Sequence, residues 1–199
     1  MIAREDITGL ILAGGRGSRM GGTDKGLQPF RGAPMAMHTL MRLSPQTGGM
    51  LINANRNLAA YESFGVPVVT DSVPDFAGPL AGMLAGLEQC QTGWMLSAPC
   101  DSPFLPTDLA ARLASAIDSE NAQMAIPVTI DTDGHRQVQP VFCLMPVTAL
   151  DSLLAFLNGG GRKIETWAAS HRLAEVLFED AGAFANINTL DELRTLEAR

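Results

Sequence analysis

A glycine-rich stretch near the start of the chain concentrates positive charge, although the formal net charge of the whole chain is -7. Residues 10–27 read LILAGGRGSRMGGTDKGL, and Arg16, Arg19 and Lys25 stand among the glycines. Glycine permits positive φ and lets a ligand approach the backbone closely. Successive N–H groups in such a loop can form a concave cradle for an anion. These residues therefore predict a phosphate-binding loop.

The residues present exclude two better-known glycine-rich loops. A P-loop requires Gly-Lys followed by Ser or Thr, whereas Lys25 lies between Asp24 and Gly26. The dinucleotide-binding fingerprint requires a third glycine where this chain has Met20, and an acid at the end of the second strand, where this chain has Asn55. A flexible surface loop is the remaining alternative, but flexibility alone does not explain the basic residues.

Polar side chains follow three further apolar runs. Asn53 and Asn55 close the second run, Asp71 follows the third and Asp101 follows the fourth. Ligands of open α/β sheets bind outside the carboxyl ends of the strands, so we expect these side chains to meet the phosphate-binding loop at one edge. Mg²⁺ is commonly held by one or two carboxylates together with substrate phosphates. The alternative is that Asn53 caps a helix and that the acids brace turns.

Short apolar runs and helical spacing alternate along the chain. We expect strands at residues 7–12, 50–54, 66–71, 94–98, 124–128, 138–144 and 173–178. We expect helices at residues 35–43, 58–64, 80–89, 107–117, 148–157, 162–170 and 190–197, and a turn at residues 131–134. Strands separated by helices predict a mostly parallel sheet flanked on both faces, which is a three-layer α/β/α sandwich. The length of 199 residues suits a single domain over residues 1–199.

The composition is that of an ordinary globular protein, with 46% hydrophobic and 18% charged residues. We expect no signal peptide, because Arg4, Glu5 and Asp6 interrupt the N-terminus and no apolar h-region follows. We expect no membrane span either, because no uncharged apolar run reaches the ~18 residues that a span needs. The three cysteines show no CxxC spacing, which favours reduced thiols and a cytoplasmic location. The acidic balance argues against binding to nucleic acid.

The glycine-rich loop resembles the signature of a known family. The motif Leu12-Ala-Gly-Gly-x-x-x-Arg-Met-Gly-Gly-x-Asp-Lys-Gly26 looks like that of the molybdenum cofactor guanylyltransferases, which belong to the nucleotidyltransferases of sugar-nucleotide type. The resemblance implies a Rossmann-like sheet and Mg²⁺ as cofactor. It also implies transfer of GMP from GTP to the terminal phosphate of molybdopterin, giving a guanine dinucleotide cofactor and pyrophosphate.

The resemblance also assigns roles to individual residues. The nucleotide-binding positions that it implies are Leu12, Ala13, Gly14, Gly15, Lys25, Asn53, Asp71 and Asp101. Asp101 would bind the metal, and it would act in catalysis together with Lys25 and Arg19, which would hold the triphosphate. Positions that would face the pterin are Gly78, Gly82, Asn186 and Asn188. The N-terminal half would thus bind the nucleotide and the C-terminal half the pterin.

The expected reaction needs electrostatic stabilisation more than proton transfer. A terminal phosphate, with a second pKa near ~6, is largely dianionic at neutral pH and requires no general base. We therefore expect His38, His135 and His171 to be structural or surface residues. Mg²⁺ on Asp101, with Lys25 and Arg19, would stabilise charge on the α-phosphate and on the departing pyrophosphate.

Two other functions remain open from the sequence. One is a cytidylyltransferase for the same cofactor or for another substrate, although Gly14-Gly15 after Ala13 favours guanine by resemblance. The other is a non-catalytic carrier of GTP or molybdopterin, which would keep the phosphate-binding loop without needing Asp101 and a metal. GTP and molybdopterin are the expected partners, with transient contact to molybdenum-insertion or molybdoenzyme maturation proteins.

Overall fold

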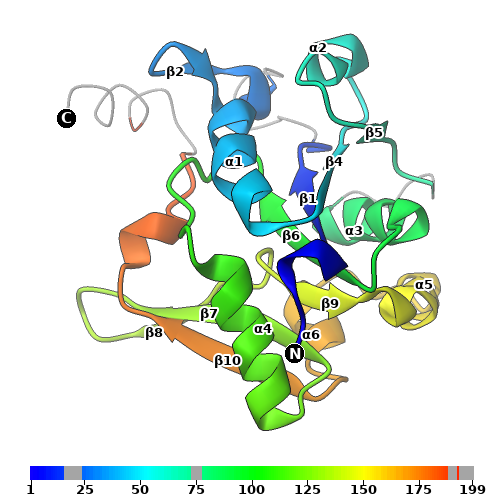
Figure 1. Cartoon of the computed structure of the whole chain (residues 1–199), viewed down its shortest axis with the longest axis vertical. Coiled ribbons are helices and arrows are strands. Elements are labelled where there is room, and N and C mark those ends of the chain that lie inside the picture. Colours follow the sequence, from blue (N-terminus) through cyan, green and yellow to red (C-terminus); the bar gives the residue numbers. More distant parts are fainter. Residues whose placement is uncertain (16–23, 73–77, 188–191, 193–199) are drawn as a thin grey trace.

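The main sheet contains both parallel and antiparallel strands. The computed structural model describes residues 1–15, 24–72, 78–187 and 192. Its strands are β1 (Ile7–Leu12), β2 (Pro29–Phe30), β3 (Ala33–Pro34), β4 (Gly49–Asn53), β5 (Val68–Val69), β6 (Trp94–Pro99), β7 (Met124–Ile130), β8 (Arg136–Val138), β9 (Leu144–Pro146) and β10 (Leu173–Phe178). The order in the main sheet is β10-β7-β9-β6-β1-β4-β5, with β8 paired to β7 (Figure 1).

Within this sheet, β1 is central and pairs in parallel with both β4 and β6. Strand β5 pairs in parallel with β4, and β10 pairs in parallel with β7. Strand β9 lies between β6 and β7 and is antiparallel to both. Strands β2 and β3 form a separate small hairpin. The sheet is therefore mostly parallel, as the sequence predicts.

Helices cover both faces of the sheet, which confirms the three-layer α/β/α sandwich. They are α1 (Met35–Leu43), α2 (Leu58–Glu62), α3 (Pro79–Gln89), α4 (Leu109–Glu120), α5 (Leu150–Asn158) and α6 (Ile164–Ala168). Five 3-10 turns are also described, namely η1 (Arg4–Asp6), η3 (Lys25–Leu27), η4 (Ser44–Gln46), η5 (Val147–Ala149) and η6 (Ala181–Phe184). In the described part of the chain, no helix is long and apolar enough to span a membrane.

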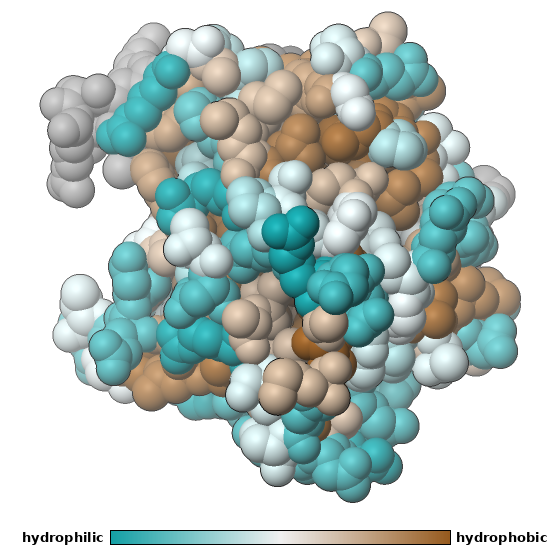
Figure 2. Space-filling view, in the orientation of Figure 1, coloured by the Kyte–Doolittle hydropathy of each residue, from teal (hydrophilic) through white to brown (hydrophobic). Residues whose placement is uncertain are grey.

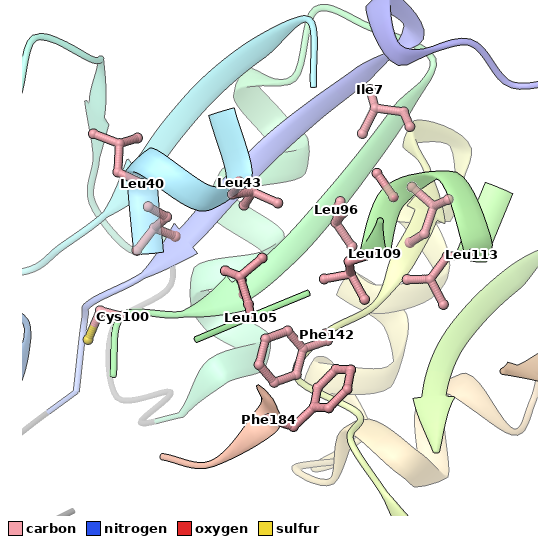
Figure 3. Close-up of a cluster of buried hydrophobic side chains, with 14 of the residues drawn as sticks. Ile7, Leu40, Leu43, Leu96, Cys100, Leu105, Leu109, Leu113, Phe142 and Phe184 are labelled. Atoms are coloured by element: carbon pink, nitrogen blue, oxygen red, sulfur yellow. The ribbon is translucent and has the colours of Figure 1, made fainter. Parts of the chain in front are cut away.

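The core consists of two layers that share the buried strand β1. Ile7 and Ile11 of β1 belong to the layer that contains α1 and α4, part of which is drawn in Figure 3. Leu10 and Leu12 belong to the layer that contains α3, α5 and α6. This alternation follows from the two-residue period of a strand, which sends successive side chains to opposite faces. A smaller cluster joins Phe30 and the β2–β3 hairpin to Met35 at the start of α1.

The outer surface mixes hydrophilic and hydrophobic side chains (Figure 2). A hydrophobic area lies in the region of α1 and α2 on the face shown there. Met41 of α1 and Leu58 of α2 are among the large hydrophobic side chains that are exposed. Exposed hydrophobic residues are normal on folded domains, because apolar atoms make up more than half of a protein's accessible surface.

Most predicted elements are present in the structure with bounds that agree within a few residues, although the strand predicted at residues 66–71 is limited to Val68–Val69 (β5). The single strand predicted at residues 138–144 is wrong, because a turn in which the Phe142 N–H donates to the Gln139 carbonyl separates β8 from β9. Pro140 within this turn cannot donate a ladder hydrogen bond. The helix predicted from residue 107 begins at Leu109, and the β2–β3 hairpin was not expected. The helix predicted at residues 190–197 lies outside the described residues, except for residue 192.

Candidate active site

The carboxyl ends of β1, β4 and β6 bring the predicted site residues to one edge. In the parallel register, Leu12 is aligned with Asn53 on one side and with Pro99 on the other. Beyond the strand, the Ala13 N–H donates to the Asn53 carbonyl at 2.8 Å, and the Cys100 N–H donates to the Leu12 carbonyl at 3.1 Å. The start of the glycine-rich loop therefore runs between the asparagines of one neighbour and the aspartate of the other.

Asp71 is held at this edge by two asparagine side chains. Its carboxylate accepts a hydrogen bond from Asn53 Nδ2 at 2.9 Å and another from Asn55 Nδ2 at 2.8 Å. The Asp71 N–H donates to Asn55 Oδ1 at 2.9 Å, so Asn55 contacts both the side chain and the backbone of Asp71. Asn55 has no predicted role, and its place directly after the strand is the feature of the sequence that could have indicated one.

Gly14 is close to the same asparagines. A Cβ at Gly14 would lie 2.8 Å from both Asn53 Oδ1 and Asn55 Nδ2. Asn55 Nδ2 also donates to the Gly14 carbonyl at 3.4 Å. Gly15, by contrast, faces open space at the Cβ position. The absence of a side chain at Gly14 thus allows the loop to contact the asparagines directly.

Lys25 and Asp101 form an ion pair across the site. Lys25 Nζ lies 3.4 Å from Asp101 Oδ2, and Asp101 is 9% exposed. Burial raises the pKa of the Asp101 carboxyl, and the Lys25 ammonium beside it acts in the opposite direction. The pair combines a cation suited to phosphate with a carboxylate suited to a hard metal ion. Both residues were predicted from the sequence, and the structure brings them together.

Asp24, which precedes Lys25, is buried and has several partners. Its Oδ1 accepts from the Tyr61 hydroxyl at 2.6 Å and from the Gly26 N–H at 3.2 Å. Its Oδ2 accepts from Asn57 Nδ2 at 3.0 Å and lies 3.7 Å from Arg56 Nε. Burial raises the pKa of the Tyr61 hydroxyl, so Tyr61 is a donor at neutral pH. None of these partners of Asp24 has a predicted role.

Asn186 and Ile187 contact the loop that carries Asp101. The Ile187 N–H donates to the Asp101 carbonyl at 3.0 Å, and the fully buried Ser102 donates from Oγ to Asn186 Oδ1 at 2.6 Å. Asn186 therefore lies beside the predicted metal ligand, although the two are far apart in the sequence. Asn188, the second predicted asparagine, lies outside the described residues, as does Arg19.

The two glycines predicted to face the pterin lie at the start and on the buried side of α3. Gly78 precedes α3 with φ 137°, a conformation that favours glycine. Gly82 is buried, and a Cβ there would lie 2.3 Å from Asn53 Oδ1 and 2.7 Å from Leu12 Cδ2. Gly82 thus lets α3 pack directly against the ends of β1 and β4.

The three histidines have local partners. His38 Nε2 lies 2.6 Å from the Phe30 carbonyl, and His171 Nε2 lies 3.0 Å from Ser152 Oγ. Asp131 and Asp133 lie in the predicted turn at residues 131–134 and His135 follows it, and potential ligand atoms of the three residues lie within 4.8 Å of one another. The Asp131 side chain accepts from the N–H groups of Asp133 and His135, so it braces the turn between β7 and β8.

The donor set at Asp101 fits a magnesium ion. Mg²⁺ binds carboxylate oxygen, retains several waters and takes further oxygen ligands from substrate phosphates, so one protein carboxylate suffices. Asp101 provides a buried carboxylate at the mouth of the loop predicted to bind phosphates. Because burial disfavours its charged form, a bound cation would stabilise the carboxylate there.

The chain is similar to known proteins over most or all of its length. The family described as "MobA-like NTP transferase domain" matches residues 9–175. A curated relative from Cupriavidus pinatubonensis, named molybdenum cofactor guanylyltransferase, is 85% identical over 198 residues, which is 100% of both chains. A relative of the same name from Bordetella pertussis is 61% identical over 198 residues, again covering 100% of both chains.

Solved structures share the fold. The molybdopterin-guanine dinucleotide biosynthesis protein A of Archaeoglobus fulgidus has a TM-score of 0.76 at 22% identity, covering 96% of this chain and 97% of that one. The 4-diphosphocytidyl-2C-methyl-D-erythritol synthase of Anaerococcus prevotii also has a TM-score of 0.76, at 14% identity, covering 98% and 97%. The full-length curated relatives decide the narrower assignment. The chain belongs to the molybdenum cofactor guanylyltransferase family, within the MobA-like NTP transferases.

Proposed function

We propose that this protein transfers a GMP unit from GTP to the terminal phosphate of molybdopterin. A phosphate oxygen of molybdopterin forms a bond to the α-phosphorus of GTP, and the bond from that phosphorus to the β-phosphate bridge breaks. The products are a guanine dinucleotide cofactor and pyrophosphate. The observation that carries the proposal is the Lys25–Asp101 ion pair, in which Nζ and Oδ2 lie 3.4 Å apart at the carboxyl ends of the central strands. The full-length relatives of the chain are named for this activity.

The nucleotide would bind along the edge formed by the ends of β1, β4 and β5. Backbone groups of residues 12–15 would surround the guanine and phosphates, and the open space at the Cβ position of Gly15 leaves room for a close approach. Asn53 and Asp71 would contact the nucleotide from the neighbouring strands, where their mutual hydrogen bond of 2.9 Å holds both side chains in place. Lys25 and Arg19 would hold the triphosphate.

Asp101 would hold Mg²⁺ together with phosphate oxygens of the substrates. When bound, the ion would neutralise charge on the α-phosphate and on the departing pyrophosphate. Lys25, whose Nζ lies 3.4 Å from Asp101 Oδ2, would stabilise charge on the same phosphates. Because the attacking phosphate is already anionic, these residues need to reduce the repulsion between the phosphates of the two substrates. They also need to hold the attacking oxygen in line with the bond that breaks at the α-phosphorus.

The pterin would bind on the side of the C-terminal half, as the family resemblance implies. The contact between Asn186 and Ser102 supports this, because it brings Asn186 to the loop that carries Asp101. Asn188 and Gly78 would face the same substrate, as the resemblance implies. Gly82 would also contribute to this side of the site, because the absence of a side chain there lets α3 pack directly against Asn53. We place the reaction in the cytoplasm, with transient contact to proteins that insert molybdenum or mature molybdoenzymes.

Pyrophosphate release tests the proposal most directly. The purified protein is incubated with molybdopterin and Mg²⁺, and release with GTP is compared with release with CTP. We expect release with GTP, none without molybdopterin, and a loss of release when Mg²⁺ is chelated. Release with CTP alone would assign the protein to cytidylyl transfer. No release with either nucleotide, despite GTP binding, would replace the enzyme with a carrier.

A further inference from the structure

The segment of residues 53–61 contacts both halves of the candidate site. Its first part contains Asn53 and Asn55, which donate hydrogen bonds to the Asp71 carboxylate. Its last part contains Asn57 and Tyr61, which donate to the Asp24 carboxylate. One short stretch that follows β4 and enters α2 therefore connects the residues on the nucleotide side with the turn that carries Lys25.

The Asp24 carboxylate is the centre of the second set of contacts. It is 7% exposed, and it caps the η3 turn by accepting from the Gly26 N–H. The Tyr61 hydroxyl, whose residue is fully buried, donates to the same oxygen at 2.6 Å. Gly26 is packed against this hydroxyl, since a Cβ at Gly26 would lie 2.4 Å from Tyr61 Oη.

The η3 turn has little stability of its own. It is three residues long, and short 3-10 turns have poor hydrogen-bond geometry. Lys25, its first residue, has a long and flexible side chain that loses rotamer freedom when its ammonium is held in one place. The backbone of Lys25 must therefore be fixed from outside if Nζ is to remain 3.4 Å from Asp101. The contacts to Asp24 on the preceding residue supply that restraint.

We propose that Asp24, Asn57 and Tyr61 are positioning residues that hold Lys25 in register with Asp101 and with the substrate phosphates. They act through the backbone of the η3 turn and do not touch the substrate. This inference rests on the proposed role of Lys25 in binding the triphosphate. It extends the functional part of the chain to α2, a helix whose residues the family motif does not include.

Tyr61→Phe is the sharpest test, because it removes one hydroxyl and retains the ring, which packs edge-on against Phe64. The readout is the Kd for GTP in the presence of Mg²⁺, measured by calorimetry, with turnover measured alongside. We expect Lys25→Met to weaken GTP binding by about 10- to 100-fold, as the loss of a charge-assisted hydrogen bond does. We expect Tyr61→Phe to weaken it by about 10-fold.

A double-mutant cycle separates positioning of Lys25 from a general structural effect. In the Lys25→Met background, Tyr61→Phe is expected to change the Kd by less than about 2-fold, because the side chain that it positions is gone. Asn57→Gly is a second variant. Glycine readily adopts the left-handed backbone of Asn57 (φ 53°), so this change deletes the amide donor and keeps the turn. It should behave as Tyr61→Phe does.

Ser152→Ala is a matched control outside the site. Ser152 Oγ accepts from Trp167 Nε1 at 3.1 Å and donates to the Ala149 carbonyl, so its loss also removes buried hydrogen bonds. It should leave the Kd for GTP unchanged. If Lys25→Met binds GTP and turns over as the wild type does, the proposed role of Lys25 fails. If Lys25→Met is impaired while Tyr61→Phe and Asn57→Gly match the wild type, or if their effects persist in full without Lys25, the positioning role is refuted.

Discussion

Asp101 is a carboxylate whose charged form depends on a neighbouring cation. Burial raises the pKa of its carboxyl, and the ammonium of Lys25 opposes that shift. In such a place the charge is stabilised by Lys25 and by any bound metal ion more than by water. Asp101 should therefore contribute little to the stability of the free protein and much to that of the protein bound to magnesium and GTP.

Asp101→Asn tests this at the scale of one side chain. The change keeps the shape and removes the charge, so the free protein should melt close to the wild-type temperature. Wild-type protein saturated with ligand at 100 times Kd gains about 2.7 kcal/mol in stability, and the variant should lose the magnesium-dependent part of this gain. Turnover should fall by ~10²–10³. Melting curves with and without Mg²⁺ and GTP decide the matter, and an unchanged ligand-induced shift would contradict the metal assignment.

Residues of the site differ in how well the sequence predicts them. Lys25, Asp71 and Asp101 follow glycines or apolar runs in a recognisable order, and the structure places all three at one edge. Tyr61 and Ser102 were missed because each is paired with a residue far away in the chain, namely Asp24 and Asn186. Hydrogen bonds between distant side chains leave no periodic pattern in a single sequence.

Helix α3 contains two buried glycines one turn apart, and they contact different parts of the molecule. A Cβ at Gly82 would meet Asn53 Oδ1 at 2.3 Å, at the candidate site. A Cβ at Gly86 would meet Leu10 Cδ2 at 2.5 Å and Met95 Sδ at 2.9 Å, within the core. The same helix therefore approaches the sheet closely for packing at one glycine and for positioning Asn53 at the other.

Gly82→Ala and Gly86→Ala form a matched pair of variants. Both should reduce the free energy of unfolding by about 1–3 kcal/mol, because the added methyl group overpacks a filled space. Only Gly82→Ala should also weaken GTP binding, since it displaces Asn53 from the Asp71 carboxylate. Denaturant unfolding and GTP titration of the folded variants measure the two effects. If Gly82→Ala and Gly86→Ala bind GTP with the same affinity, the position of Asn53 does not affect GTP binding and the role given to Gly82 is contradicted.

At the scale of elements, long runs were easier to predict than short ones. Strand β1, helix α1 and strand β10 have the predicted bounds, because each is an uninterrupted run of apolar or helically spaced residues. Strands β2 and β3 have two residues each and no detectable period. The turn at residues 139–142 was missed because the hydrophobic residues on both sides of Pro140 resemble one continuous strand.

The whole molecule has two core layers, one on each face of the main sheet. Strands β1, β4, β6, β7 and β9 place side chains in both layers, so neither layer can separate without exposing one face of the sheet. Each layer also contains one buried cysteine, Cys100 in one and Cys143 in the other. Burial raises the pKa of the Cys143 thiol to about 12 and raises that of Cys100 as well. Both groups are therefore protonated and unreactive at pH 8 in the folded protein.

Alkylation of the two thiols tests whether the chain unfolds as one domain. We expect Cys100 and Cys143 to resist iodoacetamide at pH 8 in the native protein and to become modified at the same denaturant midpoint, as a two-state domain requires. Half-buried Cys90 serves as the internal comparison. Mass spectrometry of peptides from each denaturant concentration gives the two curves. Midpoints that differ would divide the chain into separately unfolding units.

The position of β9 has a consequence for how the chain is made on the ribosome. Strand β9 fills the gap between β6 and β7, but it is synthesised after both of them. While the nascent chain grows, β1, β4, β5 and β6 can already pair in parallel, and the outer edge of β6 stays open until residues 144–146 emerge. An open strand edge is a template for pairing with other chains. The synthesis of residues 100–146 is thus the stage at which the unfinished protein most needs protection from pairing with other protein chains.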